Sequence, residues 1–311
     1  MTTRSDPALA QAIALISRTL AGAAPRPQVT TFFDEATFTA SHVVRDPGGA
    51  TCAIIDSVLD FDPASGRTRG DSAQRLVDHV AAHALRVEWL LETHAHADHL
   101  TAAPLLHRRL GGTLAIGQQI TAVQESFARL FNEGTDFARD GSQFGHLFAD
   151  GETFCIGGLD AIALHVPGHT PACVAYVVGD AVFVGDTLFM PDLGTARCDF
   201  PGGSARELYR SIRRLLALPE ATRVFLCHDY KAPGRESYAW ETTIGAERAG
   251  NVHVREGVDE AAFVAMREAR DATLPVPRLI LPAIQVNMRA GHFPAAEGNG
   301  VRYLKLPVDA L

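Results

Sequence analysis

Short apolar runs with strand-like periodicity alternate along the chain with segments that carry apolar residues at helical spacing. Turn residues such as Gly, Pro, Asp and Asn separate these runs and set their boundaries. The predicted strands are residues 29–33, 41–45, 51–55, 87–92, 145–148, 153–156, 160–165, 173–178, 181–184 and 223–227. The predicted helices are residues 71–84, 100–110, 120–131, 204–216 and 260–272, and the apolar stretch 279–286 is predicted to be extended.

The first 27 residues are predicted to form a helix and a linker ahead of the main domain. Asp6 can cap this helix, and Pro7 suits its first turn. A proline-broken linker follows at residues 24–27, so we predict one N-terminal unit at 1–27 and one large domain at 28–311. The apolar residues of the helix suggest a contact between two copies of the chain in a homodimer.

The order of the predicted elements indicates an α/β fold. Strands occur in runs that single helices interrupt, which is typical of two sheets with helices on their outer faces. Isolated polar residues follow several of the predicted strands: His94, His169, Asp186 and His228. Because rigid scaffolds commonly present functional groups at strand ends, we expect these side chains to contribute to one site.

Composition and charge exclude several classes of protein. The 47% hydrophobic and 21% charged fractions are those of a globular domain, and no apolar run is long enough for a transmembrane helix. A net charge of −8 is unfavourable for binding nucleic acid or anionic membranes. The five cysteines are scattered without CxxC spacing, which excludes a disulfide framework. With no secretory signal, this predicts a cytoplasmic protein.

A dense polar motif, His94-x-His96-x-Asp98-His99, follows the strand predicted at residues 87–92. Four imidazole or carboxylate groups so close together cannot all be buried without partners. Alternation along an extended loop would place His94, His96 and Asp98 on one side. A generic HxH sequence is usually a solvated loop, but here further His and Asp residues follow later strands. Converging nitrogen and oxygen donors of this kind predict a metal centre.

Four motifs resemble those of the metallo-β-lactamase superfamily. They are His94-x-His96-x-Asp98-His99, Pro167-Gly168-His169-Thr170, Gly185-Asp186 and Cys227-His228-Asp229. The resemblance covers about residues 30–229 and implies a four-layer αβ/βα sandwich with the metal in a cleft at one edge. It makes residues 28–311 the catalytic domain with a C-terminal extension. The reaction stays open, because this fold carries hydrolases, nucleases and oxygenases.

Longer segments resemble the persulfide dioxygenase (sulfur dioxygenase) family, in particular its bacterial β-lactamase-hydrolase-like branch. They are Phe183-Val-Gly-Asp-Thr-Leu-Phe-Met-Pro191, Gly194-Thr-Ala-Arg-Cys-Asp-Phe200, His228-Asp-Tyr230 and Pro282-Ala-Ile-Gln-Val-Asn-Met-Arg-Ala-Gly291. The resemblance implies an enzyme that oxidises glutathione persulfide with O2 to glutathione and sulfite, using one non-haem Fe(II) per chain. It implies catalytic iron ligands at His94, His169 and Asp186, a set typical of Fe(II) oxygenases.

The resemblance also assigns roles to residues around the iron. The superfamily's other metal positions, which would here orient ligands and water, are occupied by His96, Asp98, His99 and His228. Arg197 and Tyr230 match positions that contact glutathione, and Arg289 is a further candidate for binding substrate. An ion pair with Asp192 or Asp199 is the alternative role for Arg197.

Two other functions stay open on sequence grounds. All seven donors of a binuclear centre are present, so a glyoxalase II-like glutathione thioester hydrolase with two metals is one alternative. Such hydrolases usually carry a longer helical C-terminal region, whereas residues 279–286 are predicted to be extended here. A non-catalytic binding protein of the same fold is the other alternative; loss of a ligand would be its sign, and none is lost.

Overall fold

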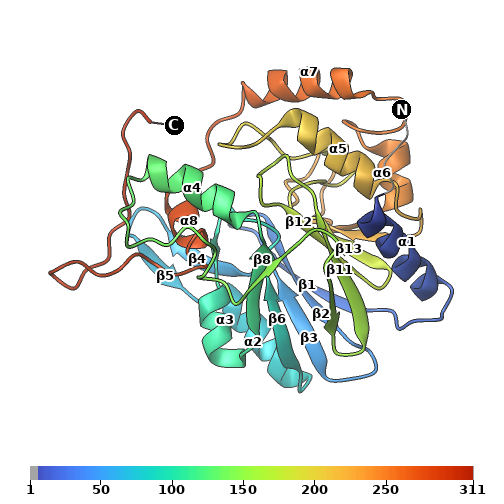
Figure 1. The fold of residues 1–311 in the computed structure, drawn as a ribbon, viewed down its shortest axis with the longest axis horizontal. Helices are drawn as coiled ribbons and strands as arrows, with labels where there is room; N and C mark the ends of the chain where they lie inside the picture. The colour runs from blue at the N-terminus through green and yellow to red at the C-terminus, as the bar shows by residue number, and fades with distance from the viewer. Residues whose placement is uncertain (1–5, 311) are drawn as a thin grey trace.

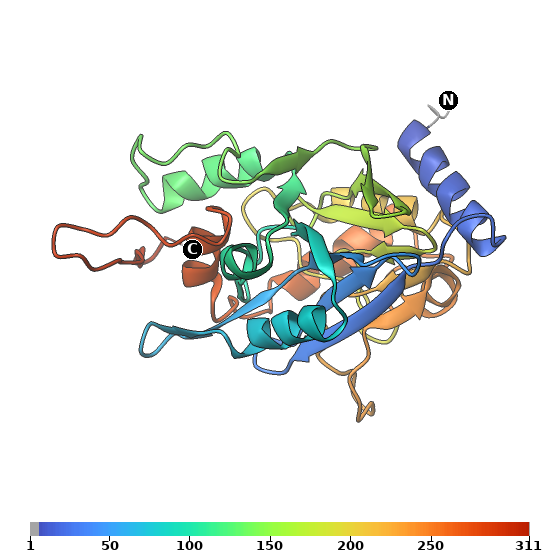
Figure 2. The same ribbon diagram turned by 90° about the horizontal axis from the view of Figure 1, so that it is seen from below.

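Two six-stranded sheets packed face to face form the centre of the protein, which the computed structural model describes over residues 6–310 (Figures 1 and 2). The first sheet has the order β1 (Gln28–Asp34), β2 (Thr39–Arg45), β3 (Thr51–Ile55), β6 (Arg86–Leu91), β8 (Thr113–Gly117), β9 (His146–Phe148). The second has the order β10 (Thr153–Ile156), β11 (Leu159–His165), β12 (Val174–Val178), β13 (Ala181–Phe183), β14 (Arg223–Phe225), β15 (Glu241–Thr243). A small third sheet joins β5 (Arg67–Arg69), β4 (Val58–Asp62) and β7 (Leu100–Thr101).

Helices cover the outer face of each sheet. The helices over the first sheet are α2 (Asp71–Ala82), α3 (Ala103–Leu110), α4 (Ile120–Leu130) and α8 (Ile280–Asn287). Those on the side of the second are α1 (Pro7–Leu20), α5 (Ala205–Leu215) and α6 (Ile244–Gly250), with α7 (Glu260–Asp271) packed on the outer side of α5 (Figure 1). Along β11, Ala161 and Ala163 face the other sheet, whereas Ile162 and Leu164 face the helices. The predicted four-layer αβ/βα sandwich is therefore confirmed.

Strand direction determines where the functional loops emerge. β13 and β14 are parallel neighbours, with Val182 opposite Val224, so the residues that follow them leave the sheet at the same edge. β3 and β6 are also parallel, with Ile55 opposite Leu91. The polar residues that the sequence places after β6, β13 and β14 are thus delivered to one end of the sandwich.

Local sequence signals account for the ends of several helices. The Asp6 carboxylate accepts a hydrogen bond from the Leu9 backbone N–H at 3.0 Å and caps α1, as predicted. Ser204 caps α5 through the backbone N–H of Glu207. α1 buries Ala12 and other apolar residues against the second sheet, so the apolar face proposed for a dimer contact is covered within the chain.

Two predicted elements differ from the structure. Residues 100–110 do not form one helix, because Leu100 and Thr101 pair with β4 and the helix α3 begins only at Ala103. The stretch 279–286 is not extended but forms most of α8. That helix is buried on nearly all sides and therefore lacks the amphipathic period by which a surface helix is recognised. The elements absent from the sequence prediction are β4, β5, β8, β15 and α6.

Among residues 6–310, no helix is both long enough and apolar enough to cross a membrane.

Candidate metal centre

The metal-binding motif and three later loops open at one edge of the sandwich. The motif follows β6, while His169, Asp186 and His228 follow β11, β13 and β14. The structure brings these side chains together in two sets whose donor atoms lie within 4.8 Å of one another. The first set is His94, His169 and Asp186, and the second set is His96, Asp98, His99 and His228.

In the first set, one carboxylate oxygen lies between two imidazoles. Oδ2 of Asp186 is 3.7 Å from Nε2 of His94 and 3.5 Å from Nε2 of His169, and all three side chains are buried. Within residues 6–310, neither Nε2 of His94 nor Oδ1 of Asp186 has a hydrogen-bond partner. Because buried polar atoms without partners are costly and a cation would satisfy them, this donor set fits a metal ion.

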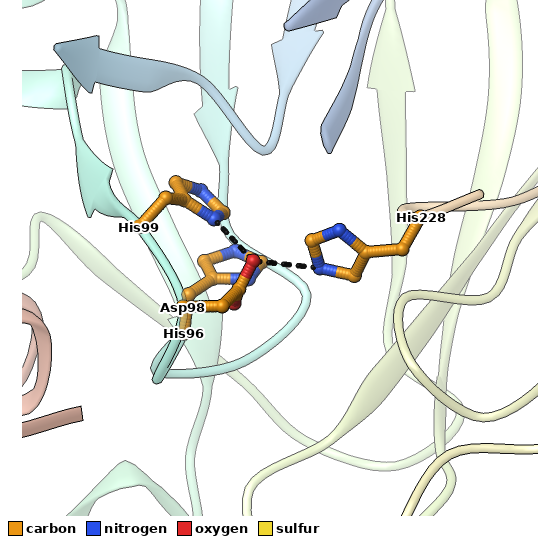
Figure 3. Close-up of side chains that lie close together, drawn as sticks. All are labelled: His96, Asp98, His99 and His228. Carbon is orange, nitrogen blue, oxygen red and sulfur yellow. Dashed lines mark hydrogen bonds and ion pairs between the residues drawn. The ribbon is translucent and has the colours of Figure 1, made fainter. Parts of the chain in front are cut away.

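The second set surrounds Asp98, as Figure 3 shows. Oδ2 of Asp98 is 3.3 Å from Nδ1 of His99 and 3.2 Å from Nε2 of His228. Nδ1 of His96, Nε2 of His99 and Nε2 of His228 have no hydrogen-bond partner in the described part of the chain. Oδ1 of Asp186 lies 3.3 Å from Nε2 of His228, so this carboxylate faces both sets.

Backbone carbonyls orient two of the imidazoles. Nδ1 of His169 donates to the carbonyl oxygen of Arg197 at 2.7 Å, and Nδ1 of His228 donates to that of Phe38 at 3.1 Å. A carbonyl can only accept, so each ring is protonated on Nδ1 and presents Nε2 to the centre. This is the usual way in which neighbouring groups fix the tautomer of a metal-binding histidine.

The surroundings of His94 and His96 shift the pKa values of these two histidines in opposite directions. Burial, together with the charges of His96 and His169, lowers the pKa of His94 well below its ordinary value. Nε2 of His96 is 3.0 Å from Asp56 and 3.3 Å from Glu92. Although burial acts in the opposite direction, these two carboxylates raise the pKa of His96 well above its ordinary value. His94 is therefore a neutral donor, whereas Nε2 of His96 is occupied by carboxylates.

Two residues that hold the motif in place were missed from the sequence. Asp56 accepts hydrogen bonds from the backbone N–H and the hydroxyl of Thr93, both at 2.8 Å. The amide of Asn287 donates to the carbonyl oxygens of His96 and His99, again at 2.8 Å. Asp56 directly follows β3, so the strand-end argument applied to the other donors would have found it. Nothing local marks Asn287, which reaches the motif from α8.

A cavity of about 470 Å³ leads from the surface to the donors. Among the residues that line it are Phe38, Asp98, His169, Asp186, Phe189, Arg197, Phe200, Tyr230, Arg267, Arg270, Leu274 and Arg278. The volume is in the range of small-molecule sites, and the mixture of aromatic and cationic side chains suits an anionic ligand with an apolar part. At the inner end Asp98, His169 and Asp186 meet the cavity, so a ligand there would reach both donor sets.

Two of the predicted substrate-binding residues line this cavity. The guanidinium of Arg197 is already held, because Nε and Nη2 donate to the two oxygens of Asp199 at 2.7 Å and Nη1 donates to the carbonyl oxygen of Pro275 at 2.6 Å. The ion pair left open as the alternative for Arg197 is thus formed. The ring of Tyr230 stacks on His228, with centroids 5.7 Å apart, and remains 45% exposed.

Arg289, the third residue predicted to bind substrate, is not among the residues that line the cavity. Nη2 of Arg289 pairs with Glu133 at 2.7 Å, and Nη1 donates to the carbonyl oxygen of Gln285. The guanidinium also lies over the ring of Phe137 at 4.4 Å. These contacts join the turn after α8 to the loop after α4, which is a structural role that sequence spacing could not reveal.

The sandwich with its His and Asp donors at one edge defines a metallo-hydrolase-type fold, and comparison with known families agrees. Residues 35–228 match the model of the metallo-beta-lactamase superfamily, and the chain belongs to that superfamily.

Several relatives share most of the chain. A probable metallo-hydrolase of Burkholderia pseudomallei is 59% identical over 90% of this chain and 98% of its own length. A beta-lactamase hydrolase-like protein of Agrobacterium fabrum is 51% identical over 92% of this chain, which spans 65% of that relative's length. The protein named glyoxylase B2 of Dictyostelium discoideum is 46% identical over 88% of this chain and 94% of its own.

More distant matches include proteins named for a dioxygenase. The mitochondrial persulfide dioxygenase ETHE1 of Bos taurus is 28% identical over 83% of this chain and 87% of its own. The crystal structure of ETHE1 from Myxococcus xanthus superposes with a TM-score of 0.68 and 30% identity, covering 85% of this chain and all of that one. The expected resemblance to the β-lactamase-hydrolase-like and persulfide dioxygenase proteins is thus confirmed.

Proposed function

We propose that this chain is an iron-dependent dioxygenase that oxidises glutathione persulfide with O2 to glutathione and sulfite. The observation that carries the proposal is the make-up of the first donor set. His94, His169 and Asp186 cluster without His96, whose donor atom belongs to the second set instead. Two histidines and one carboxylate are the ligands typical of non-haem Fe(II) oxygenases.

When bound by His94, His169 and Asp186, ferrous iron would supply accessible one-electron chemistry and open coordination positions. The chain's own residues would do the rest. The carbonyl of Arg197 keeps Nε2 of His169 directed inward, and the aromatic walls of the cavity limit access of water to the reacting sulfur. The likeness to the bovine persulfide dioxygenase and to the Myxococcus xanthus protein supports the same reaction.

Glutathione persulfide carries two carboxylates, and the cavity offers cations to receive them. Arg197 is engaged by Asp199, so its role would be to shape the wall and share its charge. Arg270 and Arg278 line the same cavity, and neither forms an ion pair with any residue between 6 and 310. We therefore assign carboxylate binding mainly to Arg270 and Arg278, with the hydroxyl of Tyr230 as an additional hydrogen-bonding group.

The second candidate is a glutathione thioester hydrolase with two metals. It is favoured by the complete second donor set, whose buried nitrogens also fit a cation. The Dictyostelium relative carries the name glyoxylase, and the C-terminal region contains the helices α6, α7 and α8, the last of which includes most of residues 279–286. Residues 279–286, which were predicted to be extended, therefore do not disfavour a hydrolase.

One experiment separates the two candidates. Iron-loaded and zinc-loaded protein would each be given glutathione persulfide in an oxygen electrode and S-lactoylglutathione in a thiol-release assay. We expect the iron form to consume O2 in proportion to the sulfite formed and the zinc form to consume none, since Zn²⁺ is redox-inert. Brisk thiol release without O2 uptake by the iron form would instead establish the hydrolase.

Matched variants test the ligand assignment. His94→Ala should abolish both iron binding and O2 uptake, whereas His96→Ala should retain measurable iron, because His96 is assigned to the second set. The metal content of both proteins would be measured by elemental analysis. Two equivalents of zinc and no iron in wild-type protein from iron-supplemented cells would contradict the one-iron proposal.

A further inference from the structure

The carbonyl that orients His169 belongs to a peptide group that is held at both ends. The peptide between Arg197 and Cys198 accepts a hydrogen bond from Nδ1 of His169 on its oxygen, at 2.7 Å. Its N–H donates to Oδ2 of Asp271 at 2.9 Å. Because a peptide group is planar and rigid, a hydrogen bond that holds its N–H also fixes the direction of its carbonyl.

Asp271 is itself fixed by a buried cation. Oδ1 of Asp271 accepts a hydrogen bond from Nε of Arg267 at 2.9 Å and lies 2.6 Å from Nη2 of the same guanidinium. The side chain of Asp271 is 4% exposed and that of Arg267 is 1% exposed. Nη1 of Arg267 donates to the carbonyl oxygen of Thr195 at 3.1 Å. Apart from the pair itself, the hydrogen bonds of these two charged groups therefore go to residues 195–198.

Stability alone does not explain the buried pair of Arg267 and Asp271. Removing two charges from water costs much of what their attraction returns, and well-packed apolar residues often serve equally well. Cys198 also packs against this pair, with its buried thiol 3.4 Å from Oδ2 of Asp271. Burial and the nearby Asp271 carboxylate raise the pKa of that thiol to about 12, so Cys198 stays a thiol and supplies no competing charge.

We propose that Asp271, held by Arg267, is a positioning residue for His169 and acts through the 197–198 peptide group. A carboxylate that accepts the peptide N–H polarises the carbonyl at the other end, since hydrogen bonds in a chain strengthen one another. The carbonyl then holds Nδ1–H of His169 more firmly and makes Nε2 a better donor. The arrangement is a carboxylate–peptide–histidine relay in place of the direct carboxylate–histidine contact common at metal sites.

The relay links the metal centre to the C-terminal region. Asp271 is the last residue of α7, and Arg267 also lines the cavity, so one helix contributes both a wall of the cavity and the support of a donor. Nη1 of Arg197 adds a further tie to this region by donating to the carbonyl oxygen of Pro275. The inference rests on the part of the proposed function that makes His169 a metal ligand, and not on the reaction catalysed.

The test is a metal titration that uses no substrate. Metal-free protein would be titrated with Co²⁺, with affinity measured by competition against a chelator and geometry followed by the visible absorption of the bound ion. We expect Asp271→Asn, which keeps the shape but removes the charge, to weaken Co²⁺ binding by about 10- to 100-fold and to change the absorption band. The control Glu260→Gln, which breaks an ion pair of the same helix with Arg210, should stay within about twofold of wild type.

A double variant separates positioning from simple stability. Arg267→Met combined with Asp271→Leu removes both charges and leaves no buried charge unpaired, so the fold should be retained. If the pair serves stability alone, this variant will bind Co²⁺ like wild type; if the relay operates, binding will remain weak at a temperature at which the variant is fully folded. The double variant also decides the question if Asp271→Asn does not fold.

His169→Ala completes the design. It should weaken Co²⁺ binding strongly, and adding Asp271→Asn in that background should have no further effect, because the two residues act in series. Full additivity of the two changes, or wild-type affinity in a folded Asp271→Asn protein, would overturn the relay. Unchanged affinity in His169→Ala alone would instead refute the proposed ligand set, so the two failures can be told apart.

Discussion

Gly168, which directly precedes His169, is expected to accept no side chain. Its φ of +141° is rarely adopted by residues with a Cβ, and a Cβ there would lie 2.3 Å from the backbone N and Cα of Leu208 in α5. Backbone strain contributes about 1–3 kcal/mol and overpacking about 1–3 kcal/mol. We therefore expect Gly168→Ala to lower the free energy of unfolding by about 2–6 kcal/mol and to reduce metal content by displacing His169.

Urea unfolding measures this loss, with Gly66→Ala as the control. Gly66 also has a positive φ, +66°, but no atom lies within 4 Å of a Cβ built on it, so only strain of about 1–2 kcal/mol is expected. The difference between the two variants then reports the contact with Leu208 together with the greater strain expected at a φ of +141°. If both variants lose the same free energy within about 0.5 kcal/mol, α5 yields to the added methyl group and the reasoning is refuted.

Four further substitutions test other parts of the structure. Burial raises the pKa of Glu247 to about 8 from 4.5, so the folded chain binds an extra proton and its stability falls as the pH rises through this range. In urea unfolding, the stability of Glu247→Gln relative to wild type should increase by roughly 2–4 kcal/mol between pH 5 and pH 8. Arg289→Ala should lower the free energy of unfolding by about 1–3 kcal/mol, because the pair with Glu133 is lost, and should leave KM unchanged. Arg278→Ala should do the reverse: steady-state kinetics should show a higher KM, and the free energy of unfolding should stay unchanged. Asn287→Ala should cost about 2–4 kcal/mol in the same unfolding assay, because three buried hydrogen bonds to residues 96–101 are lost.

Elements with a local physical signal could be predicted from the sequence. β11 carries small residues on one face and branched residues on the other, and Ser204 marks the start of α5 by its capping hydrogen bond. The failures lie where that signal is absent. α8 is apolar all round and buried, so it has no period to recognise, and β7 is a two-residue strand defined only by its pairing with β4.

The donors of the site were within reach of the sequence because motif spacing and strand ends both pointed to them. The positions of the arginines were less accessible, because each has at least one partner that is distant in the chain. Arg289 meets Glu133 across the fold, and Pro275, which fixes Arg197, lies 78 residues away in the chain. Asp271 lies 73 residues from the peptide N–H that it binds, and no pattern in a single sequence links the two.

The carboxylate of Asp186, with Oδ2 toward the first donor set and Oδ1 toward the second, has a consequence for how such sites evolve. Changes at Asp98 or His99 can alter whether a second ion is held while leaving the first set complete. Changes at Asp186 disturb both at once and so offer no gradual path. A scaffold of this kind can pass between one-ion and two-ion chemistry in a few substitutions, all on one side of a single shared residue.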